Sequence, residues 1–114
     1  MIHDPFRMKS RIDKYTYRIE WSEEDKCHVA RCLEFPSLGA HGSTAEDALR
    51  EIKFVVAESI KWLTEENEPV PIPLGLKKFK GHLTVRIPPE KHRELAIRSA
   101  EEGVSINQLV TSLL

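Results

Sequence analysis

The sequence predicts an α+β fold in which a small antiparallel sheet packs on one long helix, followed by a separate C-terminal module. Three observations lead to this prediction. Apolar and polar residues alternate in several short runs, which is the period of half-buried strands. Between residues 43 and 67 the apolar residues instead repeat at helical spacing. Beyond residue 81 the pattern is one strand, a helix, a glycine and a second helix.

The first module contains the runs that predict the sheet. Residues 15–21 alternate and form the first strand, and residues 22–26 form a polar turn of the length found between hairpin strands. Residues 27–35 form a second strand, and residues 36–42 hold a turn with room for a short third strand. The run 70–73 also alternates, but its prolines cannot donate to a ladder, so it is at most an edge strand. We therefore expect three to four strands.

The long helix begins with a capping signal. Ser43 and Glu46 have the spacing of a capping box, in which each side chain satisfies a free backbone N–H. The helix is expected to run to about Asn67, because Glu68 precedes Pro69 and so favours extended geometry. Its apolar residues form a stripe that can cover one face of the sheet: Ala45, Ala48, Leu49, Ile52, Val55, Val56, Ile60 and Leu63.

The C-terminal module has well-defined boundaries. Residues 82–87 alternate strictly and predict a strand, which Pro88-Pro89 ends while starting a helix over residues 90–102. Gly103 supplies the left-handed residue that stops this helix. Ser105, an N-cap type, opens a second helix with the apolar positions Ile106, Leu109, Val110 and Leu113. A lone strand cannot satisfy its backbone hydrogen bonds, so this one needs a partner.

The run Leu83 to Pro88 and the stretch 102–107 resemble the ribbon-helix-helix family, in which two chains pair their strands in the DNA major groove. The resemblance implies a homodimer in which His82, Thr84 and Arg86 read base edges. Arg86 is the strongest candidate, because a guanidinium can bond guanine bidentately. Phosphate contacts are expected from Lys80 and from the start of the second helix at Ser105, Ile106 and Asn107. The alternative is an exposed edge strand without nucleic acid.

The net charge of −1 conceals a division along the chain. Residues 1–14 form a basic leader of charge +2. Residues 15–76 carry six basic and twelve acidic side chains, whereas residues 77–114 carry seven basic and four acidic side chains. We therefore divide the chain into the leader at residues 1–14, the first module with the start of the linker at residues 15–76, and the end of the linker with the C-terminal module at residues 77–114. A basic module suits phosphate, whereas an acidic one attracts a basic partner. The alternative is that the acidic charge only maintains solubility.

Several classes of protein are not expected. No apolar run approaches the roughly 20 residues of a membrane span, and the start of the chain lacks the pattern of a secretory signal, so we expect a cytoplasmic protein. Cys27 and Cys32 lie five residues apart in one predicted strand and therefore on opposite faces, which disfavours a mutual disulfide or a shared metal. We expect no cofactor and no metal.

A second resemblance covers residues 15–74. Part of this segment resembles the HicB family of antitoxins. The residues that carry the resemblance are 29–32 through Pro36, then Leu38, Gly39, residues 41–44, and Glu46, Ala48 and Leu49. One departure is Ser37, which stands where many members carry glycine. The resemblance implies a degenerate ribonuclease H-like domain that binds and neutralises a HicA-type ribonuclease toxin. It further implies repression of the shared operon by the tail as a dimer, with a tetramer of two dimers as the alternative.

Phe54 is the candidate toxin-binding residue. On a helical wheel it lies nearly opposite Ile52 and Leu63, so it should be exposed, and an exposed aromatic residue among charges can anchor a partner. Single exposed apolar residues are also common, which leaves a neutral role open.

Catalysis is a weaker hypothesis. Glu20, Glu34 and Asp47 are dispersed and have no metal-ligand spacing, so we assign no catalytic residue and expect no enzyme. Besides the antitoxin, two hypotheses stay open: a stand-alone ribbon-helix-helix regulator with a small-ligand sensing domain, and a weak nuclease.

Overall fold

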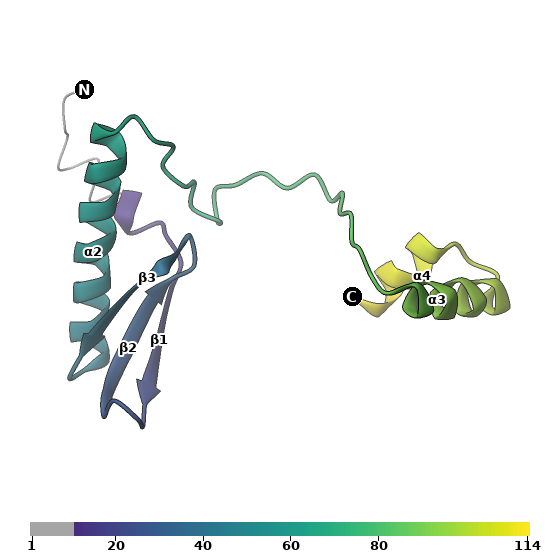
Figure 1. The fold of residues 1–114 in the computed structure, drawn as a ribbon, viewed down its shortest axis with the longest axis horizontal. Helices are drawn as coiled ribbons and strands as arrows, with labels where there is room; N and C mark the ends of the chain where they lie inside the picture. Colours follow the sequence, from purple (N-terminus) through teal and green to yellow (C-terminus); the bar gives the residue numbers. More distant parts are fainter. Residues whose placement is uncertain (1–10) are drawn as a thin grey trace. The chain divides into compact units, whose positions relative to one another are not determined.

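The structure, a computed structural model, describes residues 11–114. The chain divides into two units, Met1–Lys78 and Phe79–Leu114 (Figure 1). The fold class is α+β, as predicted. The elements in chain order are β1 (Tyr17–Ser22), β2 (Cys27–Cys32), β3 (Phe35–Gly42), α2 (Ala45–Glu65), α3 (Pro89–Glu102) and α4 (Ile106–Leu113).

The N-terminal unit is a three-stranded antiparallel sheet of order β1-β2-β3 with α2 lying along one face (Figure 1). In the register, Ile19 lies opposite Ala30, and Ala30 opposite Ala40. Directly paired residues share a face of a sheet, so this row packs toward α2. Ile52 and Val56 of the helix are fully buried against it, at 0% exposure. Small residues on the sheet thus allow a close approach of the helix.

The start of α2 differs from the prediction. The N-cap is Thr44, whose hydroxyl accepts a hydrogen bond from the Asp47 N–H at 3.0 Å. The Ser43 hydroxyl instead donates to the Asp47 carboxylate, so the predicted capping box of Ser43 with Glu46 is wrong. The physical reason is that β3 continues through Gly42, and the chain needs two further residues to turn into the helix.

The end of α2 is a Schellman motif. The helix stops at Glu65, slightly before the predicted end, because Asn67 adopts a left-handed conformation with φ of +57°. The Glu68 N–H then donates to the Leu63 carbonyl at 2.8 Å, and the Asn67 N–H to the Thr64 carbonyl at 3.2 Å. These bonds satisfy helix carbonyls that would otherwise lack a partner.

The strand boundaries also need correction. β2 ends at Cys32 rather than at Phe35, because the Leu33 N–H donates to the Thr16 carbonyl and the chain reverses at Leu33 and Glu34. β3 is therefore a strand of 8 residues, longer than expected. Residues 70–73 form no strand. The Pro71 carbonyl accepts a hydrogen bond from the Tyr15 hydroxyl at 2.7 Å, so side-chain contacts hold this segment.

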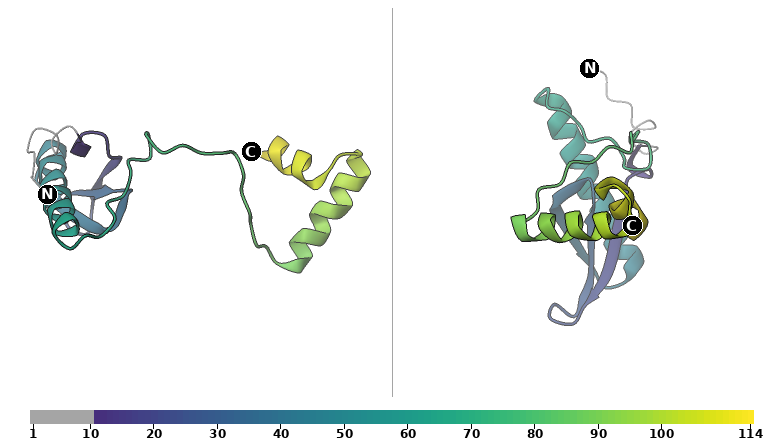
Figure 2. Two further views of the ribbon diagram at one scale, coloured as in Figure 1. Left: turned by 90° about the horizontal axis from the view of Figure 1, so that it is seen from above. Right: turned by 90° about the vertical axis from the view of Figure 1, so that its right-hand side faces the viewer.

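The C-terminal unit contains α3 and α4, which pack together (Figure 2). Pro89 occupies the first turn of α3, and Gly103 ends the helix with φ of +71°, as predicted. Ser105 caps α4 in a capping box with Gln108, which confirms Ser105 as the N-cap. None of the helices within residues 11–114 is long and apolar enough to cross a membrane.

The strand predicted at residues 82–87 is absent from the single chain. These residues have no regular secondary structure, and Leu83 and Val85 are 78% and 63% exposed. The physical reason is that a strand exists only through hydrogen bonds to a second strand, and residues 79–114 contain no other. The prediction of DNA binding therefore depends on a second copy of the chain, which the structure does not contain.

Candidate partner-binding surfaces

The outer face of α2 carries aromatic and acidic side chains. Phe54 is 63% exposed, which confirms the exposure expected from the helical wheel. Trp62 lies eight residues further on the same face and is 59% exposed. Acidic residues share this face at helical spacing: Asp47, Glu51, Glu58 and Glu65. The opposite side of the helix is buried in the core.

A groove lies beside this face, between α2 and β3. Its volume is about 480 Å³, and Phe54, Trp62 and Leu38 are among its lining residues. Phe35 also lines it; this buried ring meets the Tyr15 ring edge to face at 5.3 Å. β3 is the last strand of the sheet, so one backbone edge of it has no strand partner within residues 11–114.

The sequence prediction included Phe54 but missed Trp62 and the residues of β3. The spacing of eight residues between Phe54 and Trp62 was a usable signal, because it corresponds to slightly more than two helical turns. The contribution of β3 could not be found in this way, since the strand was expected to be short.

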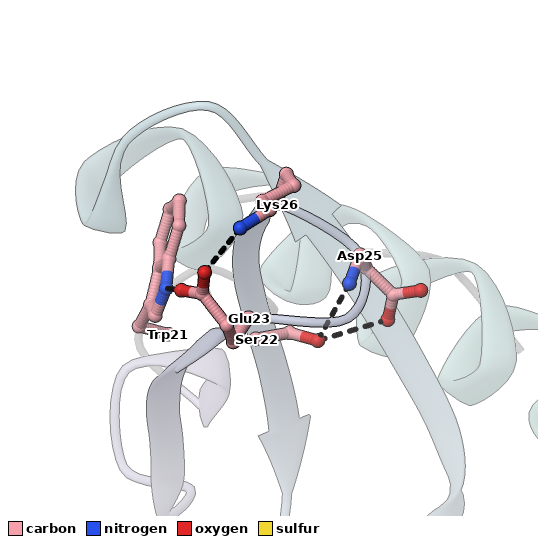
Figure 3. Close-up of polar contacts among 5 residues, drawn as sticks. All are labelled: Trp21, Ser22, Glu23, Asp25 and Lys26. Atoms are coloured by element: carbon pink, nitrogen blue, oxygen red, sulfur yellow. Dashed lines mark hydrogen bonds and ion pairs between the residues drawn. The ribbon is translucent and has the colours of Figure 1, made fainter.

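A further exposed aromatic residue, Trp21, lies where β1 enters the turn before β2 (Figure 3). Its indole N–H donates to the Glu23 carboxylate at 2.8 Å, and its ring contacts His28 edge to face at 5.2 Å. Lys26 pairs with the same carboxylate, and the hydrogen bonds from Lys26 and then Trp21 lower the pKa of Glu23. These groups are exposed, so the contacts order the turn and contribute little to stability.

The three acids considered for catalysis are not assembled as a metal site. The Glu34 carboxylate accepts hydrogen bonds from the Thr16 N–H and the Leu74 N–H, both at 2.9 Å. Partial burial raises the pKa of Glu34, but these backbone hydrogen bonds outweigh it and the pKa is lowered. Asp47 interacts with Ser43 and Arg50, and Glu20 is exposed opposite Val29. Within residues 11–114, no three His, Cys, Asp or Glu side chains gather in a way that would hold a metal ion.

The two cysteines differ in burial. Cys27 and Cys32 are both free thiols, the first half-buried and the second buried. Burial raises the pKa of Cys32 to about 11, so this thiol is neutral at physiological pH.

The predicted DNA-contacting residues lie in the C-terminal unit. His82, Thr84 and Arg86 are exposed on the segment 82–87, and Lys80 is exposed just before it. At the start of α4, the Ser105 N–H and hydroxyl are both bonded to Gln108. Ile106 is half-buried and Asn107 is exposed in the following turn. The single chain does not form the paired ribbon that would aim the first three residues at bases.

Comparison with known families adds one finding. The model of the HicB family matches residues 65–114, from the last residue of α2 through the C-terminal unit. The match supports a HicB-family protein. It lies at the C-terminal end, whereas the HicB resemblance noted in the sequence covers residues 15–74. The match is also consistent with a role as the antitoxin of a toxin–antitoxin system. No curated protein matches the chain. No solved structure matches it either.

Proposed function

We propose that this chain is the antitoxin of a type II toxin–antitoxin system. Its N-terminal unit would have the HicB-like, degenerate ribonuclease H-like fold and would bind and neutralise a HicA-type ribonuclease toxin in the cytoplasm. Its C-terminal units would pair in a homodimer as a ribbon-helix-helix and repress the operon that encodes both proteins. The observation that carries this proposal is the HicB match over residues 65–114.

The charge of the N-terminal segment supports a basic toxin as partner. Residues 15–76 carry a net charge of −6, with four acidic side chains on the outer face of α2. A ribonuclease must attract an RNA backbone and therefore presents a basic surface. Opposite charges steer two such proteins together.

The exposed apolar residues of the C-terminal unit support pairing. Leu83, Val85 and Ile87 alternate on the segment 82–87 and are 78%, 63% and 40% exposed. In an antiparallel ribbon of two copies, alternate side chains would be buried on the helices while His82, Thr84 and Arg86 point outward. A second copy would thus supply the strand that the single chain lacks.

The role of Arg86 is tested by Arg86→Ala. We expect normal neutralisation of the toxin and weaker binding of operator DNA, by about 1 to 3 kcal/mol if the guanidinium bonds a guanine bidentately. The measurement is an electrophoretic shift on the DNA upstream of the operon, after co-purification of the chain with the protein of the neighbouring gene. Arg98→Ala, at an exposed arginine of α3 that pairs with Glu102, is the matched control. An unchanged shift for Arg86→Ala would refute the assigned role.

One observation favours the stand-alone regulator with a sensing domain. The groove of about 480 Å³ beside α2 falls in the size range of small-ligand pockets. A neighbouring gene for a small basic protein that co-purifies with this chain would favour the antitoxin. Absence of such a protein, together with a small molecule that alters the operator shift, would favour the regulator.

A further inference from the structure

We propose that the groove between α2 and β3, together with the outer face of α2, is the surface that binds the basic partner protein. We call it the α2 groove surface; it comprises Glu51, Phe54, Glu58, Trp62, Glu65 and Leu38. This inference rests on the proposed antitoxin function and goes beyond it by naming the residues that make the contact.

Two exposed aromatic residues of α2 line the groove. Phe54 and Trp62 lie two turns apart on α2, and both line the groove together with Glu58 between them. They are 63% and 59% exposed, although aromatic side chains of this size are normally buried to a large extent. Exposed aromatic residues beside a concave apolar surface are typical of the residues that dominate binding energy.

The side of the groove formed by β3 is lined by side chains that pack against the core. Leu38 is half-buried and packs against the core, and the buried Phe35 makes an edge-to-face contact with Tyr15. A rigid wall lowers the entropic cost of binding, because the side chains do not have to be ordered by the partner. The groove therefore suits an apolar side chain that projects from a partner surface.

The charges around the groove specify a basic partner. Glu51, Glu58 and Glu65 are exposed and make no ion pair within residues 11–114, whereas the basic residues Arg50 and Lys53 of α2 are engaged by Asp47 and Asp13. Lys61, the third basic residue of α2, is exposed. A second copy docking through the same surface would bring acidic residues together, which is unfavourable. Lysine and arginine side chains of a basic protein would instead meet free carboxylates.

The test uses the full chain and the purified basic protein encoded beside its gene. Calorimetry measures the dissociation constant for wild type, Phe54→Asp and Trp62→Ala, and we expect each variant to bind at least about 30-fold more weakly. Glu58→Lys should mainly slow association, with an effect that shrinks at high salt because the charge is exposed.

Two variants, one at the end of β1 and one in the turn that follows it, are matched controls. Trp21→Ala removes an aromatic residue of similar exposure, and Glu24→Lys reverses an exposed acid in the same unit but away from the groove. We expect both to bind like wild type. Hydrogen exchange should also show protection of residues 51–65 when the partner is bound. Circular dichroism verifies that each variant is folded. If Phe54→Asp unfolds, the hydrogen-exchange data and the Glu58→Lys variant decide whether the α2 groove surface binds the partner.

The outcomes separate the two proposals. Failure of the wild-type chain to bind the basic protein would overturn the antitoxin function and this surface with it. Binding that persists unchanged in Phe54→Asp, Trp62→Ala and Glu58→Lys would overturn the surface alone. Self-association of wild type that these variants abolish would show that the groove holds a second copy, which also contradicts the inference.

Discussion

Glu34 ties three segments of the N-terminal unit together. It lies in the turn between β2 and β3, and its carboxylate accepts hydrogen bonds from Thr16 before β1 and from Leu74 after α2. Thr16 contributes both its N–H, at 2.9 Å, and its hydroxyl, at 3.0 Å. A single charged acceptor thereby holds the chain that leaves α2 against the sheet.

Replacement of this carboxylate should reduce stability in a pH-dependent way. The folded pKa of Glu34 is lowered from the ordinary value of 4.5, so its contribution is present above that pH and is lost as pH falls through the folded pKa. We expect Glu34→Gln to cost about 1 kcal/mol at neutral pH, a modest value because the group is partly exposed. Urea unfolding from neutral pH to below 4.5 measures the difference, with Glu24→Gln as control. A loss that is equal at every pH would contradict the role of the charge.

At the scale of elements, the junction of β3 and α2 depends on the absence of one side chain. A Cβ at Gly42 would collide with the backbone of Ala48 in the first turns of α2. Since the helix begins only three residues after Gly42, the end of the strand passes directly against it. This close approach fixes how near the start of α2 can lie to the end of β3.

Gly42→Ala tests this junction. The added methyl has no room to relax because the atoms it meets are backbone, so we expect a loss of about 2 to 3 kcal/mol in the free energy of unfolding. Gly75→Ala is the control, because nothing lies within 4 Å of a Cβ at that position. Thermal unfolding compares the two variants. Equal melting temperatures for Gly42→Ala and wild type would show that the helix shifts at no cost.

At the scale of the whole molecule, the two units differ in how completely they bury apolar surface. The N-terminal unit has a continuous core, whereas only Ser99 and Leu109 are buried in residues 79–114. The exposed large apolar residues of the C-terminal unit include Leu83, Val85, Ile87, Ile97, Val104, Leu113 and Leu114. A unit this small is rarely stable alone, so we expect a second copy to complete it.

Sedimentation equilibrium of Val85→Pro tests the pairing. Proline cannot donate to a ladder, so we expect this variant to be monomeric at concentrations where wild type is dimeric. Lys78→Pro, which lies before the segment 82–87, should leave the dimer intact. Hydrogen exchange of residues 82–87 should slow in wild type as concentration rises. A wild-type chain that is monomeric throughout would contradict the ribbon.

The features that depend on neighbouring residues could be predicted from the amino-acid sequence. Gly103 ends α3, Ser105 caps α4, and the apolar stripe of α2 leaves Phe54 exposed, all as predicted. Each of these features is set by interactions within about four residues along the chain, so the local pattern suffices.

The features that depend on residues far apart in the chain could not be predicted in this way and became apparent in the folded structure. The turn at Leu33 and Glu34 exists because Thr16 supplies its partners, and the groove exists because β3 lies beside Trp62. The same reason explains the missing strand at residues 82–87. Its alternating pattern is present in the sequence, but a strand is held by hydrogen bonds to another strand, and the single chain provides none in that unit.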